Sequence, residues 1–147
     1  MRQPIDQDYD IKYQSLMSNV VSGTTTSFAP QMYIDNNYLI TLTIYNEGVV
    51  QDLSAQTDWR CGIGDLGDTG PLLEIDDTDI NVAEDGADPE NGITTIRVNT
   101  NSAALEADLS TREYKRYYLE LQSNSASTVT TNALFPVNVR NTVYEIG

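Results

Sequence analysis

Histidine is absent from this 147-residue sequence, and Cys61 is its one cysteine. Without an imidazole, Ser-His and Cys-His nucleophiles, histidine general bases and most transition-metal sites are excluded. A lone cysteine forms no internal disulfide and is a poor start for a zinc site. One Trp and two Phe supply few aromatic platforms for a glycosidase cleft. We therefore expect a protein that is not an enzyme and that uses no cofactor.

Basic residues and long apolar runs are also scarce. Eight Lys and Arg stand against 22 Asp and Glu, which gives a formal net charge of -14. Such a field repels the phosphates of nucleic acid and of anionic lipid headgroups. No apolar run approaches the roughly 18 residues of a membrane span, and the N-terminus is too polar for a signal-peptide core. The sequence predicts a soluble, unprocessed single domain, made in the cytoplasm, that binds neither nucleic acid nor membrane.

Several short segments alternate apolar and polar residues with the period of a half-buried β-strand. The clearest is NYLITLTIYN at 37–46, and TDWRCGIG follows at 57–64 after a turn at Glu47-Gly48, an order that indicates a hairpin. Two shorter segments, 73–75 and 96–98, flank a connection rich in turn residues. We expect these two short strands to pair with each other.

The C-terminal third adds two longer strands and one helical turn. REYKRYYLELQSN at 112–124 alternates, and odd positions from 129 to 139 are apolar or small, with Pro136 facing the other way and indicating an edge or a bulge. NSAALEADLS at 101–110 predicts a short helix with Ser102 as its cap. Several short strands and almost no helix predict an all-β fold, a single antiparallel β-sandwich.

The first 33 residues differ in character from the rest. Tyr9, Ile11 and Tyr13 alternate in an extended segment, and a Thr-rich stretch follows. One interpretation is a first strand with a frayed terminus. The other is an extended arm over 1–33 that leaves a sandwich formed by 34–147 and adds a strand to a neighbouring subunit. On that hypothesis the partner-binding residues are Tyr9, Ile11, Tyr13, Leu16 and Phe28.

An acidic segment at 65–90 carries ten carboxylates and no basic residue. Such oxygens could bind Ca²⁺. An EF-hand loop needs alternating carboxylates, a central Gly and a closing Glu, and DDTDINVAEDGA supplies Asp77 and Asp79 without that Gly or Glu in register. We therefore predict a solvated loop and no metal site, with Ca²⁺ as the alternative.

Trp59 and Cys61 share the face of one strand and are expected to be buried in the core, although Trp59 could instead be an interface anchor. Cys61 is then a small apolar group and not a nucleophile. The basic cluster of Arg112, Lys115 and Arg116 is expected to pair with the chain's own acids or with solvent, and an acidic partner is the alternative.

The order of these features resembles that of a known family. A strand that ends in a step Asp52-Leu53-Ser54, a Gly-led strand at 92–98, a helical turn at 103–109 and a Tyr-x-Leu-x-Leu strand at 117–121 follow one another. Over about residues 37–140, this pattern resembles the immunoglobulin-like sandwich domain of tailed-bacteriophage structural proteins, of the upper baseplate, head-fibre and tail-fibre type.

The resemblance implies a virion component without catalytic residues: a capsid decoration or head-fibre protein, or a tail adaptor. Such a chain would be made in the host cytoplasm and would dock on other phage structural proteins in several symmetric copies, as a homo-oligomer. The alternative is a carbohydrate-binding sandwich that recognises a host surface glycan. A glycan platform needs exposed aromatic rings, so burial of Trp59 would weaken that alternative.

Overall fold

The computed structural model describes residues 7–14, 24–25, 30–46, 48–67, 69–82 and 84–141. Its regular structure is mostly β, which confirms the all-β prediction. The elements, in chain order, are β1 (Gln7–Gln14), β2 (Thr24–Thr25), β3 (Gln31–Tyr33), β4 (Asn37–Asn46), β5 (Val49–Val50), β6 (Thr57–Gly64), β7 (Leu73–Ile75), the 3₁₀ turn η1 (Asp77–Asp79), β8 (Ile80–Asn81), the 3₁₀ turn η2 (Pro89–Asn91), β9 (Ile93–Asn99), α1 (Ala103–Asp108), β10 (Tyr114–Ser125) and β11 (Thr128–Arg140).

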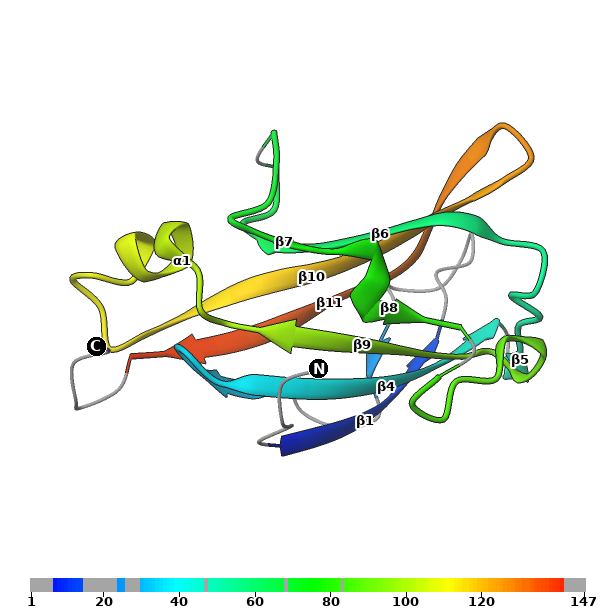
Figure 1. Ribbon diagram of the computed structural model, residues 1–147, viewed down its shortest axis with the longest axis horizontal. Helices are drawn as coiled ribbons and strands as arrows, with labels where there is room; N and C mark the ends of the chain where they lie inside the picture. The colour runs from blue at the N-terminus through cyan, green and yellow to red at the C-terminus, as the bar shows by residue number, and fades with distance from the viewer. Residues whose placement is uncertain are drawn as a thin grey trace.

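The strands form two sheets (Figure 1). The first has the order β2-β1-β4-β9-β8, with β5 paired to β4, and the second has the order β3-β11-β10-β6-β7. Both sheets are mixed, because β1 runs parallel to β4 and β3 runs parallel to β11. The prediction of a purely antiparallel sandwich is therefore wrong. A parallel pair needs a connection of a dozen or more residues, and the chain between residues 14 and 37 is long enough to provide it.

One hydrophobic core lies between the sheets. The first sheet contributes alternate residues of β4, beginning with Tyr38, and the second contributes alternate residues of β6, β10 and β11. The largest fully buried side chains are Tyr117, Phe135, Ile11, Met32, Ile34, Ile40, Leu42, Ile44, Ile63, Ile96, Leu105 and Leu109. The period of two was therefore a reliable guide to which residues face inward.

Two predicted strand pairings are wrong. β4 and β6 do not form a hairpin, since β4 turns at Gly48 into β5 and β6 belongs to the other sheet. β7 does not pair with β9 either: it pairs with β6, while the two-residue β8 pairs with β9. Alternation shows which face of a strand is buried, but it carries no information about which strand lies beside it.

The predicted helix is confirmed, whereas the irregularity of the last strand lies at Asn132 and not at Pro136, which pairs regularly with Tyr118. Ser102 caps α1 by accepting a hydrogen bond at 3.2 Å from the Leu105 N–H, and Leu105 and Leu109 are buried. A register shift in the β10 and β11 pairing leaves Asn132 as an extra residue of β11. The inward alternation therefore holds only from Ala133 onward. No helix in the described ranges is long and apolar enough to cross a membrane.

Candidate functional site

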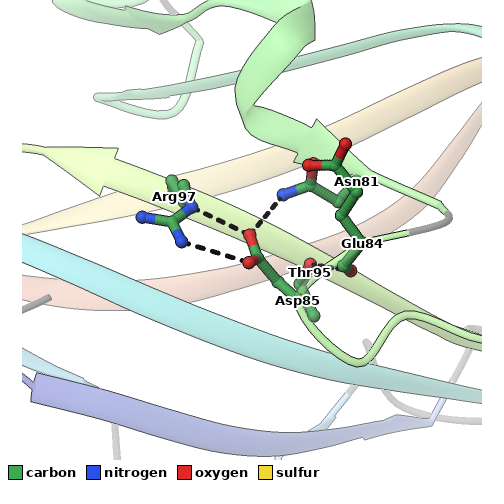
Figure 2. Close-up of polar contacts among 5 residues, drawn as sticks. All are labelled: Asn81, Glu84, Asp85, Thr95 and Arg97. Atoms are coloured by element: carbon green, nitrogen blue, oxygen red, sulfur yellow. Dashed lines mark hydrogen bonds and ion pairs between the residues drawn. The ribbon is translucent and has the colours of Figure 1, made fainter. Parts of the chain in front are cut away.

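One arginine fastens the C-terminal part of the acidic segment to the first sheet (Figure 2). Asp85 accepts hydrogen bonds from Arg97 Nε at 2.8 Å and Nη2 at 3.1 Å, and from Asn81 Nδ2 at 2.9 Å. The Thr95 hydroxyl donates to the Glu84 carbonyl at 3.4 Å. The Arg97 and Asp85 side chains are only 19% and 17% exposed, so this two-bond pair is better shielded from solvent than an ordinary surface ion pair.

The other carboxylates of the acidic segment mostly stabilise local turns. Asp76 accepts from the Thr78 N–H at 3.1 Å, which lowers the pKa of the Asp76 carboxyl, and Asp88 accepts from Asn91 Nδ2 at 2.7 Å. Within the described part of the chain, no three His, Cys, Asp or Glu side chains are grouped to hold a metal ion. The geometry therefore assigns Asp76 and Asp88 to turns and Asp85 to Arg97.

Two of the predicted partner-binding residues lie in the core of their own chain. Ile11 is 1% exposed and Tyr13 is 5% exposed, both on the inner face of β1. The Tyr13 ring lies 6.3 Å from the Phe135 ring, which joins β1 to the second sheet. In this arrangement β1 is a structural strand of the first sheet.

Tyr9 is more exposed than the other two β1 residues. Its ring is 6.0 Å from the Tyr38 ring, and its hydroxyl donates to the Gln31 carbonyl. The remaining predicted residues, Leu16 and Phe28, lie outside the described residues. A partner-binding role for the predicted set stays a prediction.

The residues predicted to be in the core of β6 are where the sequence placed them. Cys61 is 3% exposed, and its burial raises the pKa of the thiol. Trp59 is half-buried and packs against the core. Cys61 is thus an unreactive apolar group, and Trp59 is unavailable as a flat, fully exposed platform.

Lys115, from the predicted basic cluster, takes part in a second charged network. This network lies at the opposite end of the sheets from the β10–β11 hairpin. Lys115 Nζ lies 2.9 Å from Asp65 Oδ2 and 2.9 Å from Asp108 Oδ2. The buried Tyr117 donates its hydroxyl to the same Asp108 oxygen at 2.6 Å. The network joins the end of β6, the end of α1 and β10. Own-chain pairing of this lysine is therefore confirmed.

Acid titration is expected to weaken this network. The hydrogen bonds from Tyr117 and then from Lys115 lower the pKa of Asp108. A lowered folded-state pKa means that the contribution to stability is present above the unfolded value of about 3.9 and is lost as the pH falls through the folded value. Urea midpoints of the wild type and of Asp108→Asn should therefore differ most at neutral pH and converge in strong acid. A difference independent of pH would contradict this assignment.

A groove of about 380 Å³ lies on the outer face of the second sheet, under the loop between β6 and β7. Its wall residues lie opposite one another in the β6 and β10 register: Gly64 with Tyr118, Gly62 with Glu120, and Arg60 with Gln122. A Cβ added to Gly62 would lie 2.6 Å from Pro71 Cβ. This groove was not predicted from the sequence, although the outward-facing glycines of GIG were a signal that a loop crosses there.

Comparison with known proteins finds matches among solved structures. No protein-family model matches the sequence, and no curated protein matches it. The solved structure described as the N-terminal domain of phage TP901-1 ORF48 superposes with a TM-score of 0.48. The superposition covers 92% of this chain and 98% of that chain, at 8% sequence identity.

Proposed function

We propose that this chain is a non-enzymatic structural component of a bacteriophage particle, built on an immunoglobulin-like sandwich. It is a capsid decoration or head-fibre protein, or a tail adaptor, and it docks on other phage structural proteins through its N-terminal segment and its sheet edges. The ordered series of motifs between residues 37 and 140 supports the phage assignment.

The proposal that this chain docks on a neighbouring subunit rests on the way β1 joins the first sheet. Eight residues of β1 pair in parallel with β4, from Gln7 opposite Tyr38 to Gln14 opposite Tyr45. The two strands are separated in sequence by residues 15–36, so β1 is an added strand and not half of a tight hairpin. An N-terminal strand of a neighbouring subunit would make the same contacts with β4 if it took the place of this chain's own β1, an exchange of strands that would join the subunits.

The charged groups support a structural role over a catalytic one. Arg97 is engaged by Asp85, and Lys115 by Asp65 and Asp108, so the best-shielded ions hold loops and elements together. Catalytic groups instead need an accessible position beside a bound substrate, with a pKa matched to proton transfer. A binding surface without chemistry is the simpler use of this fold.

Co-sedimentation with phage particles assembled without this chain tests the proposal. The purified protein should bind these particles to a saturating, fixed number of copies, and it should not bind particles that already carry it. Saturation at a fixed number indicates symmetric sites. Failure to bind the deficient particles, with the protein folded by circular dichroism, would overturn the proposal.

The groove on the second sheet favours a second candidate, recognition of a host surface glycan. Tyr118 lines it together with Arg60, Glu120 and Gln122, a combination of residue types suited to the face and hydroxyls of a sugar. Packing of Trp59 against the core weakens this candidate, because the largest ring does not line the groove. Glycan-array binding that Tyr118→Ala abolishes, with and without Ca²⁺, would support it over the structural role.

A further inference from the structure

The outer side of β11 is covered along its C-terminal half. β3 pairs with the last three residues of β11, and the Asn138 N–H donates to the Pro30 carbonyl at 2.9 Å. Pro136 has no N–H to offer a neighbour. The backbone of Leu134 forms a hydrogen bond with the Tyr13 hydroxyl. Each of these features prevents another strand from pairing there.

Among the described residues, none covers the N-terminal end of β11 in this way. Residues 128–131, here called the hairpin edge, pair with β10 and with no other described strand. All four residues are exposed, including Val129 at 55%, and the extra residue Asn132 separates them from the covered half. In Figure 1 the orange hairpin that joins β10 to β11 projects beyond the rest of the second sheet.

The four residues of the hairpin edge carry no charged side chain, and the one carboxylate with a hydrogen bond to them, that of Glu120 on β10, accepts from the Thr131 hydroxyl at 2.9 Å. No charged residue occurs from 121 to 139, in a chain whose formal net charge is -14. Exposed edges are usually protected by charged side chains, which repel a second strand. Thr and Val at 128–131 instead favour β pairing. Two copies of this acidic chain therefore meet less repulsion through this uncharged segment than through a surface that carries carboxylates of its own.

We infer that the hairpin edge is a self-association site, at which a second copy of this chain pairs through its own hairpin edge. Antiparallel pairing about a two-fold axis would join the two hairpins into one continuous sheet, with the same neutral surface on both sides. So short an edge gives a weak contact, which becomes effective when copies are held close together. A role for this contact between copies held on a particle rests on the proposed function, whereas the contact itself is a property of the purified chain.

The dependence of self-association on salt concentration distinguishes this contact from docking through ion pairs. Two chains that each carry a net charge of -14 repel, and salt screens that repulsion. Association through a neutral edge should therefore strengthen between about 0.05 M and about 0.5 M salt. Docking through ion pairs would weaken over the same range.

Cysteine cross-linking locates the contact. Cys61 is buried, so a cysteine introduced at Thr128, Val129 or Thr130 is the accessible thiol of the full-length chain. A disulfide needs Cα atoms about 4.4 to 6.8 Å apart, so the variant nearest the two-fold axis should form covalent dimers about tenfold or more faster than Ser110→Cys, an exposed control beyond α1. Equal rates for all four variants would overturn the inference.

Sedimentation of Val129→Lys supplies the independent measurement. The side chain is exposed, so the variant should keep the wild-type circular dichroism spectrum and thermal midpoint. Like charges placed opposite each other should weaken dimerisation by about tenfold at low salt. A wild type that stays monomeric at both salt concentrations, or a variant that associates as well as the wild type, would overturn the inference. Particle binding plays no part in these measurements. The self-association inference can therefore fail or succeed independently of the proposed function.

Discussion

Ile11→Asp is expected to leave the protein largely unfolded at neutral pH. Ile11 is 1% exposed in the core between the sheets, and truncating such a residue alone costs about 2 to 5 kcal/mol. An unpaired buried carboxylate adds several kcal/mol more. The sum approaches the whole stability of a domain, about 5 to 15 kcal/mol. Circular dichroism and urea unfolding measure the outcome.

Leu66→Asp is the matched control for this substitution. Leu66 is 57% exposed, so the same kind of change should alter the free energy of unfolding by about 0.5 kcal/mol or less. Ile11→Val should fall between the two, at about 0.5 to 1.5 kcal/mol. If Ile11→Asp instead unfolds at the urea concentration of Leu66→Asp, β1 leaves the core of the isolated chain, as an arm that docks on a neighbour would.

The same packing changes what removal of residues 1–33 should do. The deletion takes away β1 and β3, and with them the buried Ile11, Tyr13 and Met32. It also leaves β4 without its parallel partner. A truncated chain that fails to bind particles therefore proves nothing about docking until its fold has been checked, and single substitutions in β1 are the cleaner probes.

The faces of the strands could be predicted from the sequence, whereas their partners could not. Alternation in β4 and β10 correctly placed Ile40 and Leu119 in the core, because burial repeats every second residue whatever lies alongside. The pairing of β1 with β4 depends on a long crossover, and that of β8 with β9 on only two residues. Neither leaves a local pattern, so a simple antiparallel order was the natural and incorrect expectation.

The residues of the candidate sites were likewise predictable only where their role depends on residue type and not on the fold. The capping role of Ser102 follows from residue type and was predicted from the sequence. The pairing of Arg97 with Asp85 could not be predicted, because it joins residues twelve positions apart across a turn in which Asp85 has a φ of 58°. The hairpin edge also depends on the fold: its neutrality is visible in the sequence, but its lack of a neighbour is not.

Gly92 occupies a crowded junction at the start of β9. Its φ is +75°, in the left-handed region, where it ends η2 as the C-cap. Its carbonyl accepts a hydrogen bond from the Ile44 N–H at 2.9 Å. A Cβ built there would lie 2.8 Å from the Ile44 carbonyl oxygen and 2.9 Å from the Gln51 carbonyl oxygen. These are backbone atoms of the β4–β5 hairpin, which cannot move aside as a flexible side chain would.

Gly92→Ala should therefore destabilise the protein by about 2 to 5 kcal/mol, from backbone strain of about 1 to 2 kcal/mol together with overpacking of about 1 to 3 kcal/mol. Gly86→Ala is the control, because Gly86 has a φ of +86° but nothing within 4 Å of an added Cβ. Gly86→Ala should therefore lose only the stability that the backbone strain costs. Urea unfolding of the two variants separates the effects: equal losses would mean that β4 and β5 do not pack against Gly92 as the structure shows. A larger loss for Gly92→Ala would establish that this glycine holds the acidic segment against the first sheet through close contact.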